Sequence, residues 1–134
     1  MSIVSEVPAA HSDIAKAHFA TRLALETDCS DVASVLGTDK QDFVLLHVIS
    51  SPANFAKRHI QGAVHLPHRE ITQERLKTYP MDTLFVVYCA GPHCNGADKA
   101  AFKLASLGRP VKVMIGGIQG WIDEGFELAG ELTA

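Results

Sequence analysis

Short apolar segments alternate with amphipathic ones along most of the chain, and this alternation predicts the class of fold. Several apolar segments lack the polar alternation of a sheet with one wet face, as expected for strands covered on both faces. The predicted strands are 22–27, 43–49, 63–66, 84–88 and 111–115. Because helical segments separate most of these strands, we predict an α/β domain with a central, mainly parallel five-stranded sheet flanked by helices.

Capping residues and glycines indicate where the helices begin and end. Ser-Asp pairs stand at the start of two helical segments, and Pro52 can begin a third. Beyond the central strand, apolar residues recur at helical spacing until Gly108. The predicted helices are 12–20, 30–35, 52–57, 97–107 and 118–124. We therefore divide the chain into an N-terminal arm with a helix, 1–20, and an α/β domain, 21–134.

Composition and charge disfavour several classes of protein. The chain has 134 residues, which fits one domain, and a formal net charge of −3 with acidic and basic residues interspersed. We see no basic tract for nucleic acid, no apolar run of the ~18 residues that a membrane span needs, and no secretory signal. Three cysteines argue against a disulfide scaffold and for a reducing, cytoplasmic compartment.

The segment VVYCAGPHCNGADKAA, residues 86–101, carries the candidate chemistry. Its first cysteine, Cys89, ends a predicted strand and precedes a helix, and ligand sites of α/β sheets lie beyond such strand ends. Gly91 and Gly96 let several N–H groups turn inward as a nest for an anion. We expect these amides to lower the pKa of Cys89 and to bind an incoming oxyanion. The alternative is an inert buried thiol.

Three motifs in the same order give the chain a family resemblance. FVLLHV followed by NFAKRHIQGAVHLP, then VVYC, then KVMIGGIQGWIDEGFEL resemble the rhodanese homology domain over about residues 23–128. The resemblance implies a rhodanese-like three-layer fold and a single-domain sulfurtransferase. Cys89 would take a sulfane sulfur from thiosulfate or a persulfide and hold it as a persulfide. It would then pass the sulfur to a thiol or cyanide, without a metal or organic cofactor.

The loop after Cys89 is the expected substrate and anion-binding site. Its residues are Ala90, Gly91, Pro92, His93, Cys94 and Asn95. The chain departs from the family, because His47-Val48-Ile49 replaces the usual Asp-Val-Arg and the loop is longer and has no arginine. An arginine fork is a good bidentate partner for an oxyanion. Backbone amides, His93, Arg58 or Arg69 could take over that role.

The second thiol of the loop and the histidines leave alternatives open. Cys94 could be a resolving thiol for Cys89 or could pack under the loop. Metal binding is disfavoured, because neither candidate set has the paired short spacings of a zinc site. The two sets are His59, His65 and His68, and Cys89, His93 and Cys94.

Two other functions compete with sulfur transfer. One is a catalytically weak binding or redox-sensing module that uses Cys89 and Cys94. The other is a phosphatase or arsenate reductase, which would need an arginine where Asn95 and Gly96 stand. The expected partners are a small sulfur donor and a thiol acceptor, either a small molecule or a protein. Nucleic acid and membranes are not expected as partners.

Overall fold

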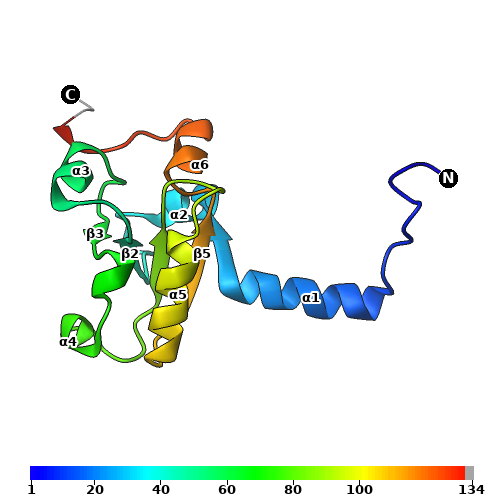
Figure 1. Ribbon diagram of the computed structural model, residues 1–134, viewed down its shortest axis with the longest axis horizontal. Coiled ribbons are helices and arrows are strands. Elements are labelled where there is room, and N and C mark those ends of the chain that lie inside the picture. Colours follow the sequence, from blue (N-terminus) through cyan, green and yellow to red (C-terminus); the bar gives the residue numbers. More distant parts are fainter. Residues whose placement is uncertain (132–134) are drawn as a thin grey trace.

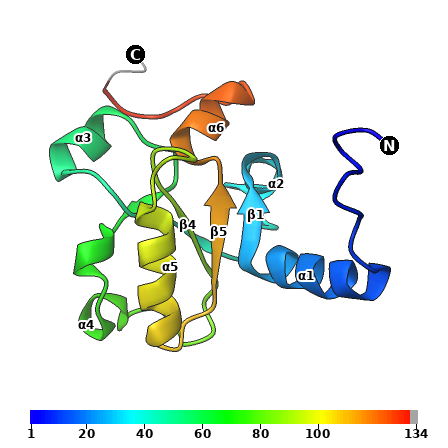
Figure 2. The ribbon, with the colours of Figure 1, turned by 45° about the vertical axis from the view of Figure 1, so that its right-hand side comes forward.

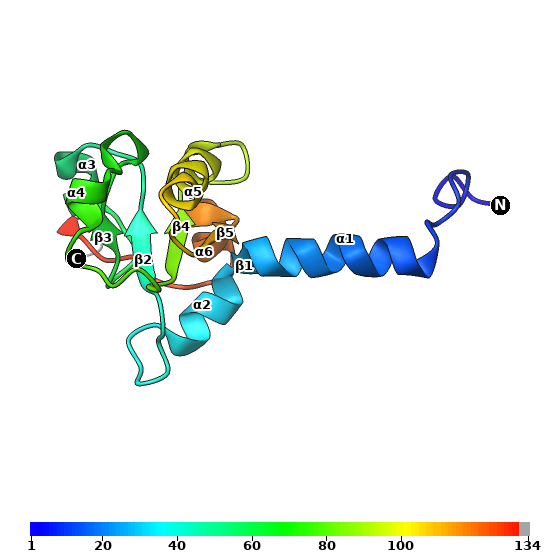
Figure 3. The ribbon, with the colours of Figure 1, turned by 90° about the horizontal axis from the view of Figure 1, so that it is seen from below.

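Five parallel strands form one sheet in the computed structural model, which describes residues 1–131. The strands are β1 (Glu26–Asp28), β2 (Val44–His47), β3 (Val64–His65), β4 (Phe85–Tyr88) and β5 (Val111–Ile115). Their order across the sheet is β1-β5-β4-β2-β3, and every pairing is parallel (Figure 3). The predicted α/β class and five-stranded sheet are therefore confirmed.

Helices cover both faces of the sheet and make three layers (Figure 3). The helices that the structure describes are α1 (Ser12–Leu25), which lies outside these layers, and α2 (Cys29–Val35), α3 (Pro52–Lys57), the 3-10 helix η1 (His68–Glu70), α4 (Gln73–Leu76), α5 (Gly96–Ser106) and α6 (Gly117–Asp123). Successive strand residues point to opposite faces. In β4, Phe85 and Val87 pack with α4 and α5, whereas Val86 and Tyr88 pack with α2 and α6. The central strand thus contributes to both cores.

The N-terminal helix is longer than predicted, and the strand after it is shorter. The sequence predicted a helix over 12–20 and a strand over 22–27, but α1 continues to Leu25 and β1 is confined to Glu26–Asp28. Arg, Leu, Ala and Glu are good helix formers. An ion pair between Arg22 and Glu26, 3.3 Å apart, adds one i,i+4 contact. The sheet edge pairs three residues of β1 with β5, so the segment before them stays helical.

Helix α1 extends away from the body of the molecule (Figures 1 and 2). None of its residues is buried. The helix runs through residue 20, where we predicted the arm to end, and the division at 20–21 stays a prediction. No helix among the described residues has the length and apolar character to cross a membrane.

Candidate active site

Cys89 directly follows β4, the central strand of the sheet. All four residues of β4 are buried, and Cys89 follows them with 4% of its surface exposed. The chain then makes the loop 90–95 and enters α5 at Gly96. Cys89 belongs to the core on the α5 side of the sheet. The thiol therefore lies at the carboxyl edge of the sheet, as the sequence predicted.

Helix α6 holds the backbone on both sides of this thiol. The N–H of Ile118 donates to the carbonyl of Cys89, and the N–H of Gln119 donates to that of Ala90, both at 2.9 Å. Gly117 has a φ of 60°, and a Cβ there would lie 2.3 Å from the carbonyl oxygen of Cys89. A side chain cannot fit in that gap, which explains the glycine at this position. This close contact between α6 and the loop could not be predicted from the sequence.

The Cys89 thiol is surrounded by backbone groups of its own loop. Its Sγ–H donates to the carbonyl oxygen of Cys94 at 3.2 Å, and the N–H groups of Ala97 and Gly91 approach the sulfur. Burial raises the pKa of Cys89, the Ala97 N–H opposes that rise, and the neighbouring Cys94 thiol adds to it. The expectation that helix-start amides lower the pKa of Cys89 is therefore wrong, because burial outweighs them.

Cys94 receives the hydrogen bonds that we expected at Cys89. The N–H of Gly96 donates to its sulfur at 3.5 Å, and the N–H of Ala90 and the Cys89 thiol lie close enough to this sulfur to lower its pKa. Burial would raise the pKa of Cys94, but these donors and the charge of Lys99 together lower it. The backbone amides around the loop are therefore divided between two sulfurs, and anion binding by the loop stays a prediction.

The rest of the predicted loop faces outward. The side chains of Pro92, His93 and Asn95 are exposed. Asn95 precedes α5 without a side-chain capping bond. The His93 ring lies over Gly91, where its Cε1 would be 3.5 Å from an added Cβ. The loop therefore surrounds the Cys89 sulfur with backbone groups and Cys94, and the side chains of Pro92, His93 and Asn95 border the solvent.

A small cavity adjoins both thiols and is acidic. Its volume is about 250 Å³, and Cys89, Cys94 and the glycines after β5 line it. Among the described residues that line it are two carboxylates, Glu26 and Asp98, and no Lys or Arg. The sequence analysis missed both carboxylates. Asp98 lies in the first turn of α5 and could have been recognised, whereas Glu26 reaches the site through the pairing of β1 with β5.

The cationic side chains proposed to replace the missing arginine lie elsewhere. Arg58 and Arg69 are exposed, and neither they nor His93 line the cavity beside Cys89. Arg69 borders a separate hollow of about 540 Å³ next to Ile49 and Ser50. An oxyanion in the cavity at Cys89 would therefore meet backbone amides and no guanidinium group.

His47 replaces the family's aspartate with a buried neutral network. Its Nδ1 pairs with the hydroxyl of Tyr88 at 2.8 Å, and its Nε2 pairs with Ser50 Oγ at 3.2 Å. The Tyr88 oxygen also accepts the N–H of Ile60 at 3.2 Å. Burial lowers the pKa of His47 to about 4, and the neighbouring His65 and His59 add to that shift. The network links β2, β4 and the segment after α3.

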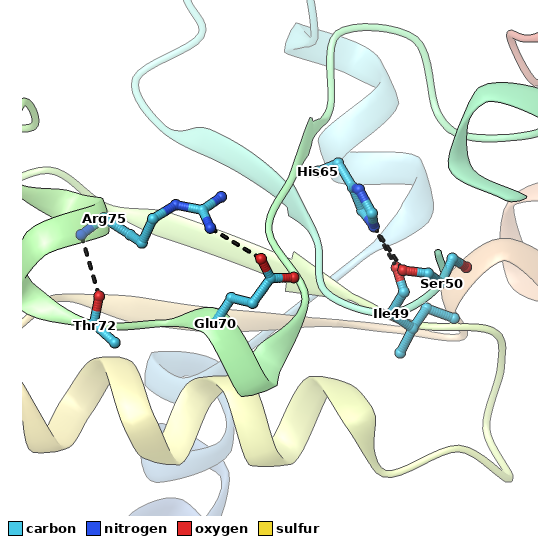
Figure 4. A network of polar contacts seen from close by, with 6 residues as sticks. All are labelled: Ile49, Ser50, His65, Glu70, Thr72 and Arg75. Atoms are coloured by element: carbon cyan, nitrogen blue, oxygen red, sulfur yellow. Dashed lines mark hydrogen bonds and ion pairs between the residues drawn. The ribbon is translucent and has the colours of Figure 1, made fainter. Parts of the chain in front are cut away.

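Ile49 stands where the family usually has an arginine, and the His65 side chain contacts the backbone at this position. Figure 4 shows that His65 Nε2 contacts the carbonyls of Ile49 at 2.8 Å and Ser50 at 2.9 Å. Farther along, Arg75 donates to a carboxylate oxygen of Glu70 at 3.0 Å.

Across residues 1–131, no group of three His, Cys, Asp or Glu side chains is arranged to hold a metal ion.

Comparisons with known proteins agree with this geometry. Residues 31–124 match the family described as the rhodanese-like domain. The solved structure of the BH2092 protein from Bacillus halodurans is 33% identical, with a TM-score of 0.85, over 91% of this chain and 88% of that one. No curated protein matches the chain.

Two more distant structures show the same fold. The rhodanese-like domain of the Alr3790 protein from Anabaena is 23% identical, with a TM-score of 0.69, over 80% of each chain. A thiosulfate sulfurtransferase from Pseudomonas aeruginosa is 20% identical, with a TM-score of 0.63, over 83% of this chain and 21% of that one. At these identities the likeness establishes the fold alone.

Proposed function

The chain belongs to the rhodanese-like domain family, and on that premise we propose that it is a sulfurtransferase with Cys89 as its nucleophile. The observation that carries the proposal is the position of this thiol at the end of β4, with amides of Gly91 and Ala97 directed at its sulfur. The Cys89 thiolate attacks the sulfane sulfur of a donor, and the rest of the donor leaves as a thiolate from a persulfide or as sulfite from thiosulfate. An acceptor thiolate then takes the sulfane sulfur, and Cys89 leaves as a thiolate that the two amides stabilise.

The charge of the cavity favours a persulfide over thiosulfate as the donor. Thiosulfate is a dianion, and it would enter beside the carboxylate of Asp98 with backbone amides as its donors, because Arg22 already pairs with Glu26. A thiol persulfide carries less charge on its reacting end. We therefore assign the donor to the persulfide class and the acceptor to thiols, whether small molecules or proteins. A reducing compartment such as the cytoplasm would keep the three cysteines as thiols.

The paired thiols also favour a second candidate, a redox-sensing module without sulfur transfer. The observation behind it is the S–H of Cys89, which donates to the backbone carbonyl of Cys94 at 3.2 Å and leaves this buried thiol protonated at rest. Such a protein would respond to oxidants and would not gain sulfur from donors.

Mass spectrometry after anaerobic incubation with cysteine persulfide or thiosulfate separates these functions. We expect the Cys94→Ser variant to gain one sulfur on Cys89, more readily from the persulfide than from thiosulfate. The matched control is Cys29→Ser, which changes a buried thiol that donates to the carbonyls of Ile115 and Gly117. It should behave as the unmodified protein does. Folded Cys89→Ser protein that still transfers sulfur would disprove the assignment.

A further inference from the structure

Two cysteine sulfurs share a single set of amide donors in this loop. Ala97 and Gly91 direct their N–H groups at Cys89, whereas Ala90 and Gly96 direct theirs at the second sulfur. In a site built for one nucleophile and its persulfide, all of these donors would serve the sulfur of Cys89. Here a side-chain thiol of the same chain occupies half of the nest. Its place next to the reacting sulfur requires an explanation beyond packing.

The two thiols are close enough for chemistry between them. Cys89 Sγ lies 3.2 Å from the carbonyl oxygen of Cys94, and each of the two thiols affects the pKa of the other. A Cβ added to Gly96 would stand 3.5 Å from both Cys89 Cβ and Cys94 Sγ. Both residues line the same cavity of about 250 Å³, which is large enough for an additional sulfur atom. Linking the two sulfurs closes a short loop and needs little movement of the chain.

We propose that Cys94 is a second catalytic residue, which attacks the Cys89 persulfide, releases its outer sulfur as sulfide and leaves a Cys89–Cys94 disulfide. This inference rests on the proposed function, because it needs the persulfide to form. The Cys94 thiolate attacks Sγ of Cys89–S–SH, and a bond forms between the two cysteine sulfurs. The bond from Sγ to the outer sulfur breaks, and that sulfur leaves with the electron pair as HS⁻.

The proposed reaction also requires a thiol reductant, because it leaves the two cysteines oxidised. Two cysteine thiols lose two electrons and become a disulfide, and the sulfane sulfur gains them and becomes sulfide. A dithiol reductant, or two monothiols, must then reduce the Cys89–Cys94 disulfide before another turnover. Cys94 is half-buried on a loop whose neighbours Pro92, His93 and Asn95 are exposed, so a reductant can reach its sulfur. The cycle would consume persulfide and reductant and produce sulfide.

The environment of Cys94 suits an attacking thiolate. Resolving thiols react fastest when their thiolate is present at the working pH. The hydrogen bonds from Gly96 and Ala90 lower the pKa of Cys94, whereas burial raises that of Cys89. Once Cys89 carries the sulfane sulfur, it no longer needs its own thiolate, and the more acidic neighbour supplies the nucleophile.

A single-turnover experiment on the full chain tests the proposal. Reduced protein, freed of reductant under anaerobic conditions, receives one equivalent of cysteine persulfide. We expect about one equivalent of sulfide per chain and a Cys89–Cys94 linked peptide. Cys94→Ser should keep its persulfide on Cys89 and release sulfide when a thiol is added. Cys29→Ser is the control, and it should match the unmodified chain.

Each possible result decides between the two proposals. A stable persulfide on Cys89 in both the unmodified chain and Cys94→Ser would overturn the role of Cys94 and leave sulfur transfer intact. No persulfide in either protein would overturn the proposed function. A persulfide that forms on Cys94 in Cys89→Ser, while Cys94→Ser gains none on Cys89, would reverse the two roles and overturn the assignment.

Discussion

The amides of loop 90–95 and the start of α5 give the two loop cysteines different acidities. Cys89 is nearly fully buried, and burial raises its pKa despite the N–H of Ala97. Cys94 is less buried and gains the N–H groups of Gly96 and Ala90, and its pKa is lowered. Cys94 is therefore both the more acidic and the less buried of the two thiols, and we expect it to react with added reagents before Cys89.

We predict that alkylation at neutral pH labels Cys94 before Cys89. The pKa of Cys94 is lowered and that of Cys89 is raised, and Cys94 is also the less buried sulfur, so both differences favour faster reaction at Cys94. The third thiol, Cys29, is an internal standard, because burial raises its pKa to about 11 and it should react last. Quantitative peptide mapping after brief iodoacetamide treatment measures the three rates. Faster labelling of Cys89 than of Cys94 would contradict the structure.

The buried His47 gives a second prediction at this scale, a loss of stability in acid. The unfolded chain protonates this residue near its ordinary pKa of 6.5, whereas the folded chain does so near about 4. The unfolded state therefore binds more protons within that window, and stability is fully present above pH 6.5 and decreases as the pH falls to about 4. His47 should contribute up to about 3 kcal/mol of this loss.

Urea unfolding between pH 7 and pH 4 measures this effect. The comparison variant is His47→Gln, which has no proton to gain in the window. We expect its free energy of unfolding to change less with pH than that of the unmodified chain, whatever its absolute stability. Parallel curves for the two proteins would show that His47 does not titrate as its surroundings require.

Single residues were predicted well where they follow from position along the chain. Cys89 was identified because an apolar strand ends at it and a helix follows, and neither fact needs tertiary structure. Its pKa was predicted in the wrong direction, because that depends on how deeply the loop packs and on where Cys94 points. The carboxylate of Glu26 was missed for the same reason, since β1 reaches the site through a pairing across the sheet.

At the scale of elements, α6 fixes the geometry of the cysteine loop. Its first amides bind the carbonyls of Cys89 and Ala90, and Gly117 lets the two backbones touch. The short helix therefore acts on the site without contributing a side chain to the reaction. The sequence predicted the glycine turn and the helix after it, but not their contact with the loop, because that contact joins segments far apart in the chain.

We predict that Gly117→Ala both destabilises the fold and impairs sulfur transfer. The added Cβ would collide with the carbonyl of Cys89, and its φ of 60° is also unfavourable for alanine. Gly37→Ala is the matched control, because Gly37 has a φ of 76° and no atom within 4 Å of the added Cβ. It should lose about 1 kcal/mol from backbone strain alone, and Gly117→Ala should lose clearly more. Equal losses in urea unfolding would refute the contact.

The N-terminal helix shows how local propensity and tertiary pairing divide a segment. Residues 22–25 were predicted as strand, yet they continue α1, because the sheet edge offers pairing to three residues of β1 alone. The hydrophobic pattern of the sequence predicts that a strand lies near this point. The residue at which the strand starts depends on its register with β5, and a local pattern gives no information on that register.

For the whole molecule, the arm contributes little to the packed body. Helix α1 buries none of its residues, although the Lys112 ammonium donates to the carbonyl of Leu23 at 2.9 Å. We predict that deletion of residues 1–20 leaves the urea midpoint nearly unchanged. Deletion of residues 1–28 also removes β1 from the sheet and should destabilise the domain strongly. A large loss from the shorter deletion would place part of the core in the arm.

The charge of the whole molecule and the charge at the site make separable predictions about the donor. The chain is acidic overall, and Asp98 borders the cavity, whereas Asp82 is exposed just before β4 at the opposite edge of the sheet. Charges more than about 8 Å apart are largely screened at physiological ionic strength.

Asp98→Asn should therefore raise kcat/KM for thiosulfate several-fold and leave that for cysteine persulfide almost unchanged. Asp82→Asn makes the same change in net charge and should alter neither value. Equal gains from both variants would mean that overall charge limits thiosulfate, and no gain from either would mean that the carboxylate beside Cys89 does not select the donor.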